Sequence, residues 1–90
     1  MKTFEDLNFE SHPNSSAGFM SFATLFFDNG YGVSVITGGY GNNEKPYELA
    51  VLHGDESESA ITYNTPITDD VLGWLTDDDV TNCMAKIQQL

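Results

Sequence analysis

The feature that most constrains the fold is the pair Asn29-Gly30, which stands between two runs of strand-forming residues. The first run, Phe19 to Phe27, is rich in aromatic side chains, and the second, Tyr31 to Thr37, carries β-branched ones. Both residues of an Asn-Gly pair tolerate positive φ, which a two-residue type I′ turn requires. The sequence therefore predicts a β-hairpin. Because both faces of the first run are apolar, that strand is expected to be central or covered on both sides.

The chain continues from the hairpin into further strand-like runs that no helix-length connection separates. Tyr47 to His53 and Ser59 to Asn64 place apolar side chains at alternate positions. The connections, Gly38 to Pro46 and Gly54 to Glu58, are polar. Consecutive strands joined in this way predict an antiparallel β-meander of about four strands.

Helix signals stand near both ends of the chain. Thr3 to Asp6 has the spacing of a capping box and predicts one short helical turn, while Leu7 to Ser11 is compatible with a short strand. Thr68-Asp69-Asp70 is expected to cap a short helix that runs through Val71, Leu72, Trp74 and Leu75.

A longer helix is expected at the C-terminal end. Thr76 is followed three positions later by Asp79, as in a capping box. Apolar residues then recur with a helical period at Val80, Cys83, Met84, Ile87 and Leu90. This stripe predicts a helix that packs on one face of the sheet. The expected fold is α+β, a single domain over residues 1–90 in which the two C-terminal helices pack on one face of the meander.

The charge of the chain limits its partners. Fourteen acidic residues stand against three lysines and no arginine, which gives a formal net charge of −11. Direct binding to nucleic acid is disfavoured, because it needs basic side chains to neutralise phosphates. Anionic membrane surfaces would also repel the chain. The favoured partner is therefore a protein with a basic groove, and the alternative is that the charge serves solubility alone.

The acidic residues gather in a turn and at the two expected helix starts, and these clusters are the candidate partner-binding residues. They are Asp55, Glu56, Glu58, Asp69, Asp70, Asp77, Asp78 and Asp79. Tyr40, in the Gly-rich connection, is a candidate aromatic anchor for the same partner. The alternative explanation is that acids in the first turn of a helix only complement its dipole.

No pattern in the chain predicts a cofactor, a metal or catalysis. A calcium loop needs glycine at its sixth place and an acid at its twelfth, and neither Asp55 nor Asp77 starts such a loop. Cys83 lies on an apolar stripe and His53 at a strand end, so neither is expected to act as nucleophile or base. One cysteine allows no intramolecular disulfide. We find no signal-peptide pattern and expect a cytoplasmic protein.

Three stretches of the chain resemble a group of small proteins encoded by tailed bacteriophages and prophages. They are Phe26 to Val35, Thr3 to Leu7 and Asn64 to Val71. Most proteins of this group have no assigned function, so the resemblance implies origin more than activity. Small acidic phage proteins often resemble inhibitors of host defence, such as anti-CRISPR and anti-restriction proteins, and this second likeness is one of class and charge.

Charge and resemblance together give the expected function. We expect a non-enzymatic inhibitor that binds a basic nucleic-acid-binding host protein or CRISPR-type complex in the bacterial cytoplasm, with nucleic-acid mimicry as one route. The alternative is a small phage accessory or structural interaction protein without an inhibitory role. Self-association into a homodimer is compatible with either.

Overall fold

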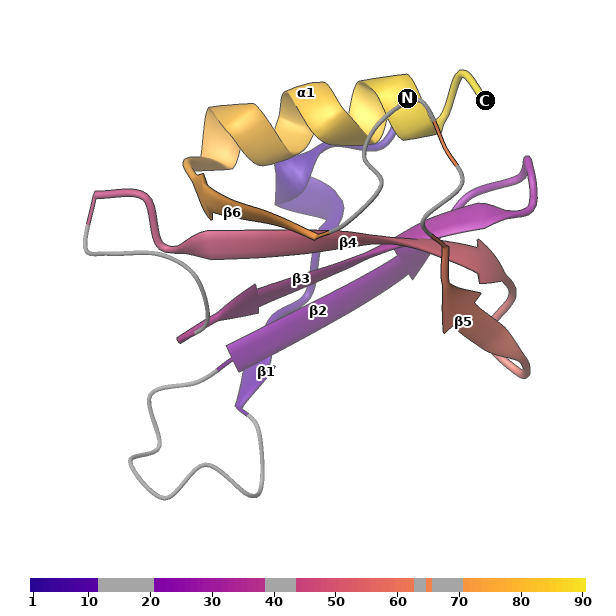
Figure 1. Ribbon diagram of the computed structural model, residues 1–90, viewed down its shortest axis with the longest axis horizontal. Helices are drawn as coiled ribbons and strands as arrows, with labels where there is room; N and C mark the ends of the chain where they lie inside the picture. The colour runs from indigo at the N-terminus through magenta and orange to yellow at the C-terminus, as the bar shows by residue number, and fades with distance from the viewer. Residues whose placement is uncertain (12–20, 39–43, 63–64, 66–70) are drawn as a thin grey trace.

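The hairpin around Asn29-Gly30 is present in a computed structural model that describes residues 1–11, 21–38, 44–62, 65 and 71–90 (Figure 1). Strands β2 (Ser21–Phe26) and β3 (Tyr31–Thr37) pair antiparallel. The Phe27 N–H donates to the Tyr31 carbonyl over 2.8 Å and closes a three-residue loop. Gly30 has a φ of 86°, whereas Asn29 has a negative φ. The type I′ prediction is therefore wrong, because one extra loop residue leaves only the glycine in the left-handed region.

The meander is confirmed and runs β1-β2-β3-β4-β5. Its other members are β1 (Glu10–Ser11), β4 (Tyr47–Gly54) and β5 (Ser59–Ile61), and every neighbouring pair is antiparallel. β2 lies between β1 and β3, as expected of a central strand, although β1 pairs only with its first two residues. A further strand, β6 (Leu72–Leu75), also pairs with the outer edge of β4. β6 pairs with the first part of β4, and β5 pairs with its last part.

The expected short helix through Val71, Leu72, Trp74 and Leu75 is wrong, because Leu72–Leu75 forms β6. Tyr47 pairs with Leu75 and Leu49 with Leu72, and the register shifts between the two pairs as in a β-bulge. The strand satisfies backbone groups of β4 that β5 does not reach, which outweighs a weak helical pattern interrupted by Gly73. The predicted cap, Thr68-Asp69-Asp70, lies outside the described residues.

The C-terminal helix α1 (Asp77–Ile87) is confirmed, and its capping box joins Thr76 and Asp79 in both directions. Val80, Met84 and Ile87 are fully buried, whereas Cys83 is half-buried and Leu90 is exposed. These three side chains share one core cluster with sheet residues: Ala23, Val33, Val35, Leu49 and Val51. The helix therefore packs on one face of the sheet, as predicted (Figure 1).

The N-terminal segment lies against α1. Its 3₁₀ turn η1 (Phe4–Asp6) starts with the predicted capping box of Thr3 and Asp6. The Phe4 N–H donates to Thr81 Oγ1 over 3.1 Å. The Gln88 side chain accepts from the Lys2 N–H and donates to the Lys2 carbonyl, each over 2.8 Å. Residues from the two ends of the chain are therefore joined by three hydrogen bonds.

Candidate functional site

Six of the nine predicted partner-binding residues lie in the described part of the chain, and they form two regions. Asp55, Glu56 and Glu58 lie in the turn between β4 and β5. Asp77, Asp78 and Asp79 form the first turn of α1. Asp69, Asp70 and Tyr40 lie outside the described residues.

The two acidic regions stand at opposite ends of β4. The β4–β5 turn follows Gly54 directly, whereas α1 begins two residues after Leu75, which pairs with Tyr47 at the start of β4. A strand of that length covers roughly 23 Å. Since the sheet holds the regions this far apart, the acids that the sequence places in one list do not form one cluster.

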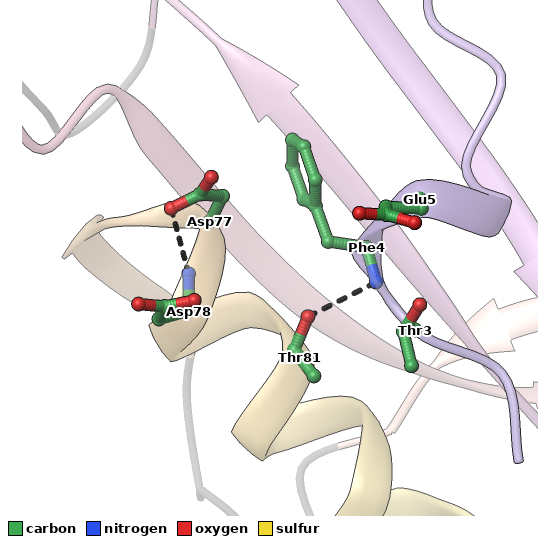
Figure 2. A pocket seen from close by; sticks show the side chains of 6 residues that line it. All are labelled: Thr3, Phe4, Glu5, Asp77, Asp78 and Thr81. Atoms are coloured by element: carbon green, nitrogen blue, oxygen red, sulfur yellow. Dashed lines mark hydrogen bonds between the residues drawn. The ribbon is translucent and has the colours of Figure 1, made fainter.

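A shallow pocket lies between η1 and the first turn of α1. It has a volume of about 360 Å³ and is lined by Thr3, Phe4, Glu5, Asp77, Asp78 and Thr81. Figure 2 shows Asp77 and Asp78 on the helix side of this pocket and Glu5 on the η1 side. We call it the acidic pocket. It exists because two capped helix starts, each with acids in its first turn, are held together by the Phe4–Thr81 hydrogen bond.

The lining residues of the acidic pocket suit a cationic group. Glu5, Asp77 and Asp78 are exposed, and Asp77 Oδ1 accepts a hydrogen bond from the Asp78 N–H over 2.9 Å. Phe4 adds an aromatic ring, and Thr3 adds a hydroxyl group. Carboxylates beside an aromatic face are the surroundings that a guanidinium or ammonium group prefers.

Two of the predicted residues have structural roles instead. Asp55 Oδ1 accepts three hydrogen bonds, from the Ser57 hydroxyl (2.7 Å), the Ser57 N–H (2.9 Å) and the Glu58 N–H (3.0 Å). These bonds, with the Ser57 hydroxyl first, hold the pKa of Asp55 below its ordinary value. Bonds from the Thr76 N–H and then its hydroxyl likewise lower the pKa of Asp79. Both carboxylates therefore organise a turn or a helix start.

Among the residues that the structure describes, no group of three or more His, Cys, Asp or Glu side chains could hold a metal ion. The His53 ring packs against Tyr31 with centroids 5.1 Å apart. Burial is the main cause that raises the pKa of the Cys83 thiol, so this thiol is protonated at neutral pH.

The sequence pattern does not reveal two exposed residues, Glu5 at the acidic pocket and Trp74 in β6. Glu5 borders the acidic pocket because η1 lies against α1, and the local capping box of Thr3 and Asp6 does not reveal this tertiary contact. The sequence pattern predicts a short helix at Trp74, but this residue is 54% exposed and its φ is 59°. A bulky residue in the left-handed region is an outlier, and the neighbouring Gly73 was the only signal of a bulge.

The chain was compared with family models, with curated proteins and with solved structures, and none of them matches it. Among the described residues, no helix is long and apolar enough to cross a membrane.

Proposed function

We propose that the protein is an acidic binding protein that inhibits a host defence nucleoprotein complex, in the manner of an anti-CRISPR protein. The acidic pocket carries this proposal, because three exposed carboxylates, from Glu5, Asp77 and Asp78, line one cavity. A basic side chain of the target, of the kind that otherwise binds a phosphate, would enter this pocket. The protein acts by occupation of the target and not by catalysis.

The second acidic region extends the proposed contact. A groove that holds one turn of duplex is about 34 Å long, so it is long enough to face both ends of β4. Glu56 and Glu58 would meet basic residues there in the same way as the acidic pocket. With a net charge of −11, the chain would also be steered towards such a groove by long-range attraction.

The test uses purified CRISPR effector complexes and restriction nucleases, with DNA binding and cleavage as readouts. Two double variants remove the same amount of charge from each region: Asp77→Asn with Asp78→Asn, and Glu56→Gln with Glu58→Gln. Asp55 and Asp79 are left intact, because their carboxylates support the local fold. A matched control changes the net charge equally elsewhere, by Asn8→Lys with Gln89→Lys.

We expect the pocket double variant to weaken inhibition at least about tenfold and the control to weaken it less, with an effect that fades as salt rises. Inhibition that survives loss of both acidic regions would contradict the electrostatic contact. Absence of inhibition across the whole panel would contradict the proposed role.

Exposed Trp74 favours a second candidate, an accessory interaction protein without an inhibitory role. Exposed tryptophans often carry much of the binding energy at protein interfaces. Binding of this kind would be insensitive to salt and would be lost in Trp74→Ala, whereas the acidic double variants would retain it.

A further inference from the structure

One edge of β2 is only partly paired. The Phe27 N–H bonds to the Tyr31 carbonyl, and the Ser21 N–H bonds to Thr37 Oγ1 over 2.9 Å. Backbone groups alternate in direction along an antiparallel pair, so the odd-numbered residues of β2 face β3 and the even-numbered ones face away. β1 occupies this outer edge at Phe22, opposite Glu10. The N–H and C=O groups of Thr24 and Phe26 therefore meet no strand among the described residues.

The edge is left open because the N-terminal segment moves to another layer. The Phe9 ring, next to β1, packs against Phe4 and Tyr47 with centroids 5.7 Å from each. Leu7 joins the core cluster under α1. This path carries the chain away from β2 and over the helix-covered face of the sheet. Residues 7–9 consequently do not continue β1 alongside Thr24.

The opposite edge of the sheet is covered in contrast. β6 pairs with Tyr47 and Leu49 of β4, and β5 pairs with its last three residues. Between these strands, the Thr62 N–H donates to the Val51 carbonyl over 2.9 Å. Natural edge strands are usually protected by lysine, proline or a bulge. β2 has none of these between Ser21 and Phe26.

A second copy of the chain does not suit this edge. If two β2 strands paired antiparallel through Thr24 and Phe26, Asp28 of each copy would meet β1 of the other, next to Glu10. Both carboxylates are exposed, and each copy has a net charge of −11. Repulsion between the neighbouring carboxylates of Asp28 and Glu10 would oppose this pairing of two copies. The same two carboxylates flank the open stretch and attract a cationic segment.

We propose that the β2 edge at Thr24 to Phe26 accepts an added antiparallel strand from a protein partner. The segment is extended, places an apolar side chain beside Phe26 and carries basic residues on both flanks, near Glu10 and Asp28. Main-chain hydrogen bonds supply affinity and alternate side chains supply selectivity, as in other cases of strand addition. This surface is separate from the acidic pocket and does not rest on the proposed inhibitory role.

The test measures amide hydrogen exchange with a defined probe. The probe is the blocked peptide Lys-Lys-Val-Thr-Val-Thr-Lys-Lys at millimolar concentration, and its control is the same peptide N-methylated at every residue from the first Val to the last Thr. The control keeps the charge but cannot donate backbone hydrogen bonds from its four central residues. In the protein alone, the amides of Thr24 and Phe26 should exchange faster than those of Ala23 and Leu25, which face β3.

We expect the probe to slow exchange at Thr24 and Phe26 at least about tenfold and the N-methylated control to leave it unchanged. Thr24→Pro should abolish the effect, because it removes an N–H that β3 does not use, while Thr24→Val should retain it. Unchanged Ala23 and Leu25 protection verifies the fold of each variant. The proposal fails if the two amides are already protected without peptide, if both peptides protect equally, or if neither does.

Discussion

Asn29, in the β2–β3 turn, donates a hydrogen bond from Nδ2 to the main-chain carbonyl of Ile87, the last residue of α1, over 2.8 Å. Its Oδ1 accepts from the Tyr31 N–H over 3.1 Å, so one amide side chain closes the turn and meets the helix end. The last carbonyls of a helix have no partner within the helix. The Ile87 carbonyl also accepts from the Leu90 N–H over 3.1 Å, so Asn29 supplies a second donor and links the hairpin to the C-terminal end of α1.

Two substitutions of Asn29 should distinguish the effect of losing the Nδ2 donor from the effect of adding a negative charge at this position. Asn29→Ala is expected to lower the free energy of unfolding by about 0.5–1.5 kcal/mol, because the Ile87 carbonyl loses one hydrogen bond and keeps the one from the Leu90 N–H. Asn29→Asp should cost more, since a carboxylate cannot donate and lies at the negative end of the helix dipole. Urea denaturation at neutral pH measures both, with exposed Gln89→Ala as control. An Asp variant as stable as the Ala variant would contradict this account.

Truncation of the helix stripe should show where its packing ends. Met84 is fully buried in the core cluster, whereas Leu90 is 37% exposed. Met84→Ala is expected to cost about 2–5 kcal/mol, and Leu90→Ala less than about 1 kcal/mol. The comparison is made by chemical denaturation. Equal losses would mean that Leu90 packs as deeply as Met84.

Gly32 is expected to tolerate no side chain, because the Phe26 ring occupies the space. A Cβ at this position would lie 2.7 Å from Phe26 Cδ1 and 2.8 Å from the Leu25 carbonyl oxygen. Gly32→Ala should destabilise the fold by about 1–3 kcal/mol. A double-mutant cycle with Phe26→Leu should recover part of that loss. Gly30→Ala, where no atom lies within 4 Å but φ is 86°, should show no coupling to Phe26.

The capping carboxylate of Asp79 should make stability depend on acid pH. Its pKa in the folded state lies below the ordinary value of 3.8 because of the Thr76 hydrogen bonds. A depressed folded pKa stabilises the protein above the unfolded pKa, and this stabilisation is lost as pH falls through the folded pKa. The difference in Tm between the protein and Asp79→Asn should therefore stay constant between about pH 7 and 5 and shrink below about pH 3.8. A difference unchanged at low pH would contradict the ionised cap.

Local patterns in the sequence predicted the parts of the fold that local physics decides. The hairpin at Asn29-Gly30, though not its turn type, the four strands of the meander and the capping boxes at Thr3 and Thr76 follow from patterns of neighbouring residues. β6 could not be predicted in this way. Its strand form depends on an edge of β4 that is distant in sequence, and that pairing overrides the weak helical pattern around Trp74.

The candidate site was predicted as residues but not as an arrangement. Charge counting found the acids, and the pattern of capping found the role of Asp79. Neither pattern shows that β4 holds the two acidic regions apart, nor that Glu5 and Asp77 line the same pocket. Both facts follow from where α1 lies on the sheet, which only long-range packing determines.

The bonds between Lys2 and Gln88 place residues 2 and 88 next to each other. A short linker that joined residue 90 to residue 1 would therefore leave every strand pairing intact. New ends cut into the exposed β4–β5 turn would interrupt no buried contact. A circularly permuted chain of this kind should fold to the same sheet and helix, with the acidic pocket intact between η1 and α1.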